Sequence, residues 1–370
     1  MTASRAMTRA QITNRIEQYL QDTGNAKFST IDINEKIDEV LVEVSLAVPY
    51  VSRDIYTIES RFGSCSATST SNLTDTNKSP FVSTDTEKIV YNTTDKTWAV
   101  IESVTSSSVV ALSADIFTVG EGYEIYNKGC WNTKQLNIED SDDFLWILGA
   151  VYPVQPIFSA SPPLRHMRNV RLVNRRNILE VDVGWVDNSG VSAADKDVHV
   201  YFARQHKLNT MTDLAGTVNG ALAVGAKTAI LAAVTDADTT IYKDTLFTLA
   251  LASGIDSRLT YRVTADATIS STAATIYFTP ALEAIVASAA VITFIGSTLP
   301  PELEPLVVQL ACADLLMSWS ISKIDEVNKG GASVSDKYYR TGEALRAKAE
   351  RKLKALIDVD LRANVVYSRS

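Results

Sequence analysis

The sequence predicts an α+β protein in which N- and C-terminal helices form a helical bundle, with a β core and two inserted small β-barrel or sandwich domains. Apolar residues at helical spacing are confined to residues 1–52 and 298–357. The sequence between these ends is rich in Thr, Ser, Val and Ala and forms short apolar runs separated by turn residues. A chain of 370 residues is too long for one ordinary domain, and 46% apolar residues is ample for several cores.

Two helices are expected at the N-terminus. The first carries an apolar face made of Ile12, Ile16, Tyr19 and Leu20, and Gly24 follows where a left-handed C-cap is wanted. The second is expected to be capped by Asp32, with Glu35 reaching back, and to end before Pro49. Its apolar stripe needs a partner surface and comprises Ile33, Ile37, Val40, Leu41 and Val44.

Two helices are also expected near the C-terminus, where they would supply that surface. The first runs from about 301 to 326, because Pro300 and Pro301 suit a first helical turn and the glutamates after them suit the positive end of the helix dipole. It is apolar around much of its circumference, through Val307, Val308, Leu310, Ala311, Leu315, Leu316 and Trp319. The last helix, from about 335 to 357, carries Leu345, Ala349, Leu353 and Leu356 on one side and basic residues elsewhere.

The middle of the chain divides into three parts. Short runs at 88–91, 98–101, 109–112 and 123–126 predict a first inserted β-domain over 53–131. Runs at 229–231, 246–249, 259–263, 274–278 and 291–294 predict a second over 211–297. Residues 132–210, with runs at 144–148, 181–183 and 199–202, are expected to form a central β core continuous with the helices.

Residues 358–370 are expected to form an extended C-terminal arm. They alternate partly between apolar and polar residues and have nothing after them to fold against, so they could add as a strand to a partner. A frayed terminus is the alternative.

No constellation of residues predicts catalysis, a cofactor or a metal. The three histidines, His166, His199 and His206, are accompanied by no Gly-x-Ser-x-Gly elbow, and the metal- and phosphate-binding motifs are absent. A glycoside hydrolase needs only two carboxylates, which a sequence of this composition always contains. The cysteines, Cys65, Cys130 and Cys312, are odd in number and widely spaced, and are expected to be reduced thiols.

Two charged runs are candidates for contacts. The first is the arginine run between Arg165 and Arg176. It could bind DNA phosphates, but it lacks interleaved aromatic residues for base stacking. The acidic run from Glu139 lacks the spacing and glycine of a calcium loop. Both are therefore expected to be solvated segments or to meet between neighbouring subunits, through Arg165, Arg168, Arg171, Arg175 and Arg176 on one side and Asp140, Asp142 and Asp143 on the other.

Several segments resemble the head-to-tail adaptor (connector) proteins of tailed phages. The N-terminal part is similar to these proteins in its capped helical run at 31–40, which ends before Pro49. The C-terminal part is similar to them in the run at 310–316, which is followed by a basic helix and a tail. Residues 134–138 leading to 151–153, and 200–206, resemble β segments of larger phage virion proteins. The block from 225 to 280, which includes the run at 261–268, resembles a small β module of phage structural proteins. Compact adaptors lack such long β insertions.

This resemblance implies a ring of identical subunits, with twelve expected, docked under the portal protein in the neck of the virion. The ring would extend the DNA channel and offer a platform to a tail or nozzle protein. Genomic DNA would pass without specific binding because the chain carries a net charge of −8; the alternative is that this charge merely keeps a protein of 370 residues soluble. The expected portal contacts lie in the arm, at Leu361, Arg362, Val365, Val366, Tyr367 and Arg369.

A virion protein that binds carbohydrate or a receptor through its β-domains is the alternative. Trp98 and Trp131 are the candidate sugar-stacking residues, although isolated tryptophans in β patterns are usually core. No run of 18 apolar residues and no secretory signal is present, so we expect a soluble protein made in the host cytoplasm, with no membrane partner.

Overall fold

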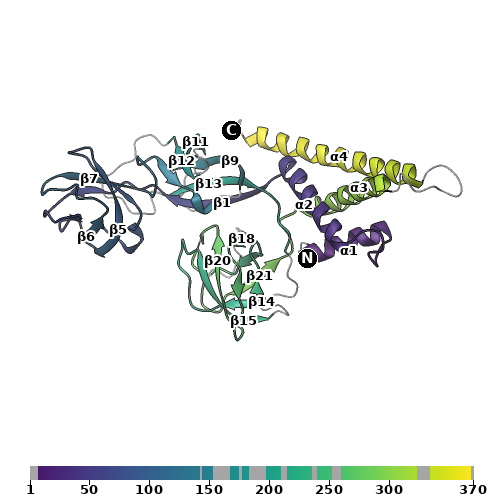
Figure 1. Cartoon of the computed structure of the whole chain (residues 1–370), viewed down its shortest axis with the longest axis horizontal. Helices are drawn as coiled ribbons and strands as arrows, with labels where there is room; N and C mark the ends of the chain where they lie inside the picture. The colour runs from purple at the N-terminus through teal and green to yellow at the C-terminus, as the bar shows by residue number, and fades with distance from the viewer. Residues whose placement is uncertain are drawn as a thin grey trace. The chain divides into compact units, whose positions relative to one another are not determined.

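The chain is described by a computed structural model, which defines residues 7–141, 144–152, 167–174, 177–182, 197–209, 215–235, 240–251, 260–282, 284–322 and 334–367. These residues form an α+β protein of four helices and many short strands (Figure 1). Two compact units result, one made of residues 1–52 and 203–370 and the other of residues 53–202. This division groups the expected central β core with the first expected insertion, and the finer division into six domains stays a prediction.

The element bounds follow the chain in order. The helices are α1 (Arg9–Leu20), α2 (Thr30–Ala47), α3 (Glu304–Ser322) and α4 (Val334–Tyr367), with short 3₁₀ turns η1 (Ser83–Asp85) and η2 (Glu139–Ser141). The strands of the second unit are β1 (Tyr50–Thr57), β2 (Phe62–Ser64), β3 (Asn72–Thr74), β4 (Ile89–Asn92), β5 (Trp98–Ser106), β6 (Val109–Leu112), β7 (Gly122–Tyr126), β8 (Gln135–Asn137), β9 (Phe144–Val151), β10 (Met167–Arg168), β11 (Val170–Asn174), β12 (Ile178–Val181) and β13 (Asp197–Arg204), of which β1 and β13 begin or end in the first unit. The remaining strands are β14 (Ala215–Val218), β15 (Thr228–Thr235), β16 (Thr240–Ile241), β17 (Leu246–Leu249), β18 (Tyr261–Val263), β19 (Ala267–Thr268), β20 (Ala274–Thr279) and β21 (Val291–Ile295).

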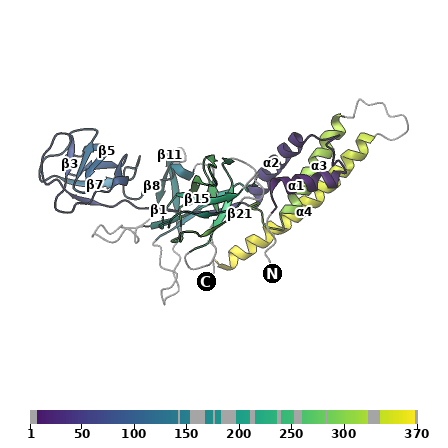
Figure 2. The same cartoon turned by 90° about the horizontal axis from the view of Figure 1, so that it is seen from below.

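The four helices share one hydrophobic cluster. Ile12 and Ile16 of α1, the stripe of α2 and the apolar side chains of α3 are buried in it, together with Ala349 and Leu353 of α4. The α3 and α4 helices run side by side (Figure 2). The expected apolar faces of the four helices are therefore confirmed as buried or partly buried, except at Tyr19 of α1, which is 51% exposed.

The caps of the first two helices differ from those expected. The α1 helix ends at Gln21, which takes the left-handed conformation with φ of 54°, so Gly24 is not its cap. The α2 helix is capped by Ser29 in a capping box with Asp32, one turn before the expected cap. Asp22 explains both shifts, because its carboxylate accepts from the peptide groups of three residues, Ala26, Lys27 and Phe28, and winds the connection tightly.

The C-terminal segment is helical where an extended arm was expected. The α4 helix continues to Tyr367, ten residues beyond the predicted end at about 357. The physical reason is that residues 343–367 contain neither Gly nor Pro and include good helix formers, so nothing stops the helix. The prediction of an extended arm over 358–370 was therefore wrong as far as Tyr367.

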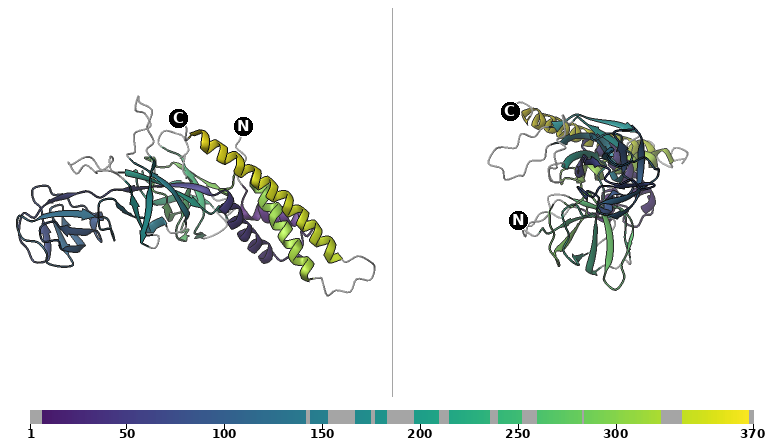
Figure 3. Two further views of the ribbon diagram at one scale, coloured as in Figure 1. Left: turned by 90° about the horizontal axis from the view of Figure 1, so that it is seen from above. Right: turned by 90° about the vertical axis from the view of Figure 1, so that its left-hand side faces the viewer.

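A closed barrel follows the crossover from the second unit. Its six strands pair in the order β14-β15-β20-β18-β17-β21, and β14 closes against β21. The barrel strands are drawn in green in Figure 3. Phe247, Tyr261 and Phe278 fill the centre, with ring centroids 5.5 to 5.6 Å apart. The expected second β-domain is confirmed as a barrel, and the five predicted strands all lie in it.

The second unit contains two β structures. The sheets β1-β13-β9-β10 and β11-β12-β8 face each other over a shared core that includes Phe144, Leu179 and Phe202. The six-stranded sheet β2-β7-β4-β5-β6-β3 encloses a separate core around Tyr123 and Ile125. Its four predicted strands are confirmed, but the sheet stays open between β2 and β3 rather than closing as a barrel.

An ion network holds the start of the six-stranded sheet. Arg61 donates to both oxygens of Glu59 and both oxygens of Asp85, and Lys88 donates to Glu59 Oε2 at 2.6 Å. Glu59 and Asp85 are buried, so each carboxylate is compensated by the cations that reach it.

Candidate functional site

A stripe along the exposed side of α4 is basic. Five basic residues fall on it at helical spacing: Lys337, Arg340, Lys348, Arg351 and Lys352. The acidic residues described as exposed on α4, Asp336, Glu343 and Glu350, flank this stripe, and Asp336 pairs with Arg340 at 3.0 Å. We call these five side chains the basic face of α4.

The exposed side of α2 carries the opposite sign. Glu35, Asp38 and Glu39 lie on it, and the exposed fractions of the Asp38 and Glu39 side chains are 56% and 62%. Asp38 pairs with Arg9 of α1, and Glu39 pairs with Lys36 of its own helix at 2.5 Å. Ile31 and Leu46 extend the same side at its two ends and are 70% and 58% exposed. Because large apolar side chains on a solvated helix favour contact with another surface, this acidic face of α2 has the composition of an interface.

A network of ion pairs centred on Arg346 connects the two helices that carry these faces. Arg346 of α4 donates to Asp314 of α3 at 2.6 Å, to both oxygens of Glu43 of α2 at 3.1 Å, and to Glu350 at 2.8 Å. One guanidinium therefore ties together α2, α3 and α4. The two charged faces are consequently held on one rigid support.

The crossing segment between β13 and the barrel is bonded to both the helices and the barrel. The His206 ring accepts at Nδ1 from Thr298 and donates at Nε2 to the carbonyl of Val48, at 3.1 and 2.9 Å. Asn209 pairs with the peptide group of Leu246 and also donates to the carbonyl of Ile295. These bonds anchor the ends of β17 and β21 beside the helices.

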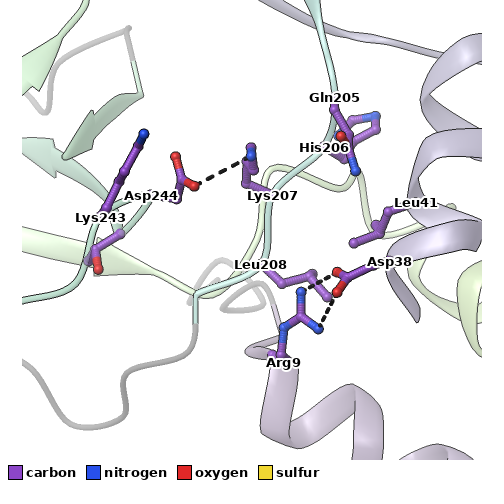
Figure 4. A pocket seen from close by; sticks show the side chains of 10 residues that line it. Arg9, Asp38, Leu41, Gln205, His206, Lys207, Leu208, Lys243 and Asp244 are labelled. Carbon is purple, nitrogen blue, oxygen red and sulfur yellow. Dashed lines mark hydrogen bonds and ion pairs between the residues drawn. The ribbon is translucent and has the colours of Figure 1, made fainter. Parts of the chain in front are cut away.

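A cavity of about 180 Å³ lies at this junction. In Figure 4, Arg9 points toward Asp38, and Lys207 points toward Asp244 at 3.5 Å. Four of the charged side chains that line the cavity are thus paired inside the chain, so they do not converge as open groups on a ligand.

The described histidines are structural. Burial lowers the pKa of His206 below its usual value, although its bonds to Val48 and Thr298 oppose that shift. Burial and the nearby charge of Arg53 lower the pKa of His199 to about 4. Both rings are therefore neutral at pH 7 and are not poised for proton transfer near neutrality. His166 lies outside the described residues.

The expected contact residues are only partly described. Arg171 is exposed on β11 and pairs with Glu180 of β12 at 3.3 Å. Arg168 and Asp140 are placed in β10 and η2 by their backbones alone, and Arg165, Arg175, Arg176, Asp142 and Asp143 lie outside the described residues. The structure does not bring the two charged runs together within the described part of the chain.

The expected portal contacts are placed on a helix. Leu361, Arg362, Val365, Val366 and Tyr367 belong to the last two turns of α4, and Arg369 lies outside the described residues. Spacing of four residues places Leu361 with Val365, and Arg362 with Val366, on neighbouring stripes of that helix.

The two candidate tryptophans are surface residues. Trp98 and Trp131 are 51% and 57% exposed, and their rings meet edge to face with centroids 5.0 Å apart. The expectation that such tryptophans belong to the core is wrong here, because Ala99 and Ile101 take the inward positions of β5. The three cysteines are free and buried.

In comparison with known proteins, no family model and no curated protein matches this chain. Among the described residues, no three His, Cys, Asp or Glu side chains are grouped as metal ligands would be. Within that same part of the chain, no helix has both the length and the apolar character that crossing a lipid bilayer requires.

Sequence reasoning missed the acidic face of α2. The apolar stripe that points inward was predicted, but no prediction was made for the residues on the outward side. The signal was present, because projecting residues 30–47 at 100° per residue gathers Ile31, Glu35, Asp38, Glu39 and Leu46 on one side.

Proposed function

We propose that this chain is a structural virion protein of a tailed phage, a head-to-tail adaptor that assembles as a ring below the portal. The observation that carries the proposal is the pair of unlike faces, basic on α4 and acidic with apolar ends on α2. Two different complementary patches on one subunit favour head-to-tail association of identical copies, and such association closes into a ring when the rotation per subunit allows it.

The helices supply the proposed ring core. We propose that α1, α2, α3 and α4 form the helical bundle of the adaptor. Its β core would be the two sheets β1-β13-β9-β10 and β11-β12-β8, and its insertions would be the barrel and the six-stranded sheet. The shared hydrophobic cluster and the Arg346 network support this, because they make elements from opposite ends of the sequence into one support. A subunit built in this way can present both charged faces at fixed positions.

The ring would continue the DNA channel. Each chain contributes a formal net charge of −8, so twelve copies would accumulate a strongly negative field. A negative wall repels phosphate, and genomic DNA would slide through without specific binding. The remaining partners are the portal protein on one side and a tail or nozzle protein on the other, which places the protein in the neck of the virion.

The end of α4 is the proposed portal contact. Since residues 358–367 are helical, we replace strand addition with docking of a helix into a groove of the portal. The residues proposed for this contact are Leu361, Arg362, Val365, Val366 and Tyr367, with Arg369 after them.

Charge reversal tests the ring. The variant Lys348→Glu/Arg351→Glu and the variant Glu35→Lys/Glu39→Lys should each fail to form rings, whereas the chain carrying all four substitutions should regain them. Mass photometry at low and high salt measures this, and the rings should weaken as salt screens the contact. The matched control Lys134→Glu/Lys243→Glu reverses two exposed charges elsewhere and should leave ring mass unchanged. Rings that persist in both face variants would refute the proposed interface.

A further inference from the structure

The outer face of the six-stranded sheet carries a row of side chains on four neighbouring strands. Trp98 of β5 pairs with Tyr91 of β4, Tyr91 pairs with Glu124 of β7, and Glu124 pairs with Phe62 of β2. Directly paired residues of antiparallel strands project from the same face. The row therefore runs across three strand spacings, about 14 Å at ~4.8 Å each.

This row is aromatic at three of its four positions and exposed at its two ends, whereas Tyr91 and Glu124 between them are half-buried. Phe62 and Trp98 are 40% and 51% exposed, whereas their neighbours along the strands, Ala99, Val90 and Ile125, are buried in the core beneath. Trp131 lengthens the row at the Trp98 end. Large exposed aromatic side chains in line across a sheet are uncommon on a solvated surface and mark a recognition site.

Polar groups stand among the rings. Glu124 accepts from the hydroxyl of Tyr126 at 2.6 Å through Oε2, which orients the carboxylate within the row. Lys78 places its ammonium group 4.0 Å from the centroid of Phe62, and Lys96 stands 5.9 Å from that of Tyr91. Each ammonium group also donates to a main-chain carbonyl, Lys78 to that of Phe62 at 2.8 Å and Lys96 to that of Thr93 at 2.5 Å, which holds both cations beside the strip.

We infer that this aromatic row, Phe62, Glu124, Tyr91, Trp98 and Trp131, is a binding site for a neutral oligosaccharide. The apolar faces of sugar rings stack on aromatic side chains, and sugar hydroxyls bond to carboxylate and ammonium groups. A row of this length favours a chain of sugars over a single ring. Residues 53–131 contain six Lys or Arg and ten Asp or Glu, and this net charge of −4 disfavours nucleic acid and other phosphate-bearing ligands.

Binding of neutral hexasaccharides tests the site. The full chain is titrated with hexasaccharides of glucose, N-acetylglucosamine and mannose, and tryptophan fluorescence and calorimetry record binding. At least one hexasaccharide should bind, and Trp98→Ala should weaken it at least tenfold while Trp98→Phe retains part of the affinity. Trp146→Ala is the matched control, since Trp146 is a 37% exposed tryptophan on β9. Its affinity should equal that of the wild type.

Three results would overturn the inference. The first is that none of the three hexasaccharides binds the folded chain. The second is that Trp98→Ala and Trp146→Ala lower affinity equally. The third is that Trp98→Ala leaves sugar binding unchanged but dissociates copies of the chain, which would make the row a protein contact. Because ring mass is measured separately, failure of the sugar site leaves the proposed adaptor function untouched.

Discussion

Gly342 of α4 faces the main-chain carbonyl of Ala313 on α3 so closely that a Cβ at this position would lie 2.8 Å from the carbonyl oxygen. The same Cβ would lie 2.8 Å from Cγ of Met317. Gly342 therefore sets the separation of the two C-terminal helices. The close packing of α3 on α4 therefore requires glycine at this position of the helix.

We predict that Gly342→Ala destabilises the protein by about 1–2 kcal/mol, because the Ala313 carbonyl belongs to a packed helix and must shift. Intrinsic helix propensity alone predicts the opposite sign, a gain of about 1 kcal/mol. Urea unfolding followed by circular dichroism distinguishes the two. Ala344→Gly, on the exposed side of the same helix, is the control and should cost the usual ~1 kcal/mol of a helix glycine.

Arg346 provides a second test of the helix packing. Replacing it with Met leaves Asp314 and Glu43 without their shared cation. We expect the free energy of unfolding to fall by about 1–2 kcal/mol. This loss is smaller than for a fully buried ion pair, because the Arg346 side chain is 33% exposed. The comparison is Arg340→Met, whose side chain is 76% exposed and pairs only along its own helix. Its cost should stay below about 0.5 kcal/mol. Equal costs would show that the network adds no stability.

Acid should unfold the second unit through Glu59. Burial alone would raise the pKa of this carboxyl, but its hydrogen bonds with Arg61 and the charges of Lys88 and Arg61 prevail and bring the pKa to about 2. A folded-state pKa below the ordinary value of 4.5 stabilises the fold above pH 4.5, and this contribution is lost as pH falls toward 2. The loss is at most about 3 kcal/mol.

Urea midpoints measured between pH 7 and pH 2.5 check this prediction. The wild type should lose stability steeply below pH 4.5, and Glu59→Gln should start lower and show a flatter slope over the same range. An equal slope in both proteins would mean that Glu59 does not carry the acid sensitivity. Asp85 adds to the effect in the same direction, because its bonds to Arg61 and Val82 lower its pKa despite burial.

Deleting residues 359–370 should abolish docking on the portal and leave the monomer folded. The positions of α4 described as buried, Ala349 and Leu353, lie before the deletion, so the described part of the shared helix cluster is retained. Co-sedimentation with portal rings and circular dichroism of the free chain measure the two effects. Unchanged docking of the truncated chain would remove the portal role from this helix end.

Helical and strand periodicity predicted the elements well because burial of one face dominates where an element forms. The caps were harder, since Ser29 with Asp32 and Asp32 with Glu35 both match a capping box in the sequence. The first pair forms because Phe28 is buried and Asp22 bonds the connection before it. Such a choice depends on tertiary packing that the local pattern does not contain.

The surfaces were predicted less well than the cores. A strand such as β5 alternates its side chains, but the sequence does not say which set is inward, so both a surface and a core position stayed open for Trp98. The aromatic row depends on the register of four strands that are distant in sequence, which no local pattern fixes. The charged faces of α2 and α4 follow from helical spacing alone and could have been read directly.

The mass and symmetry of particles formed by mixing the purified chain with the portal ring of the same genome test the central proposal most directly. The adaptor account predicts stoichiometric rings of this chain seated on the portal, with twelve copies expected. Free monomers or trimers that persist in the presence of the portal would contradict it.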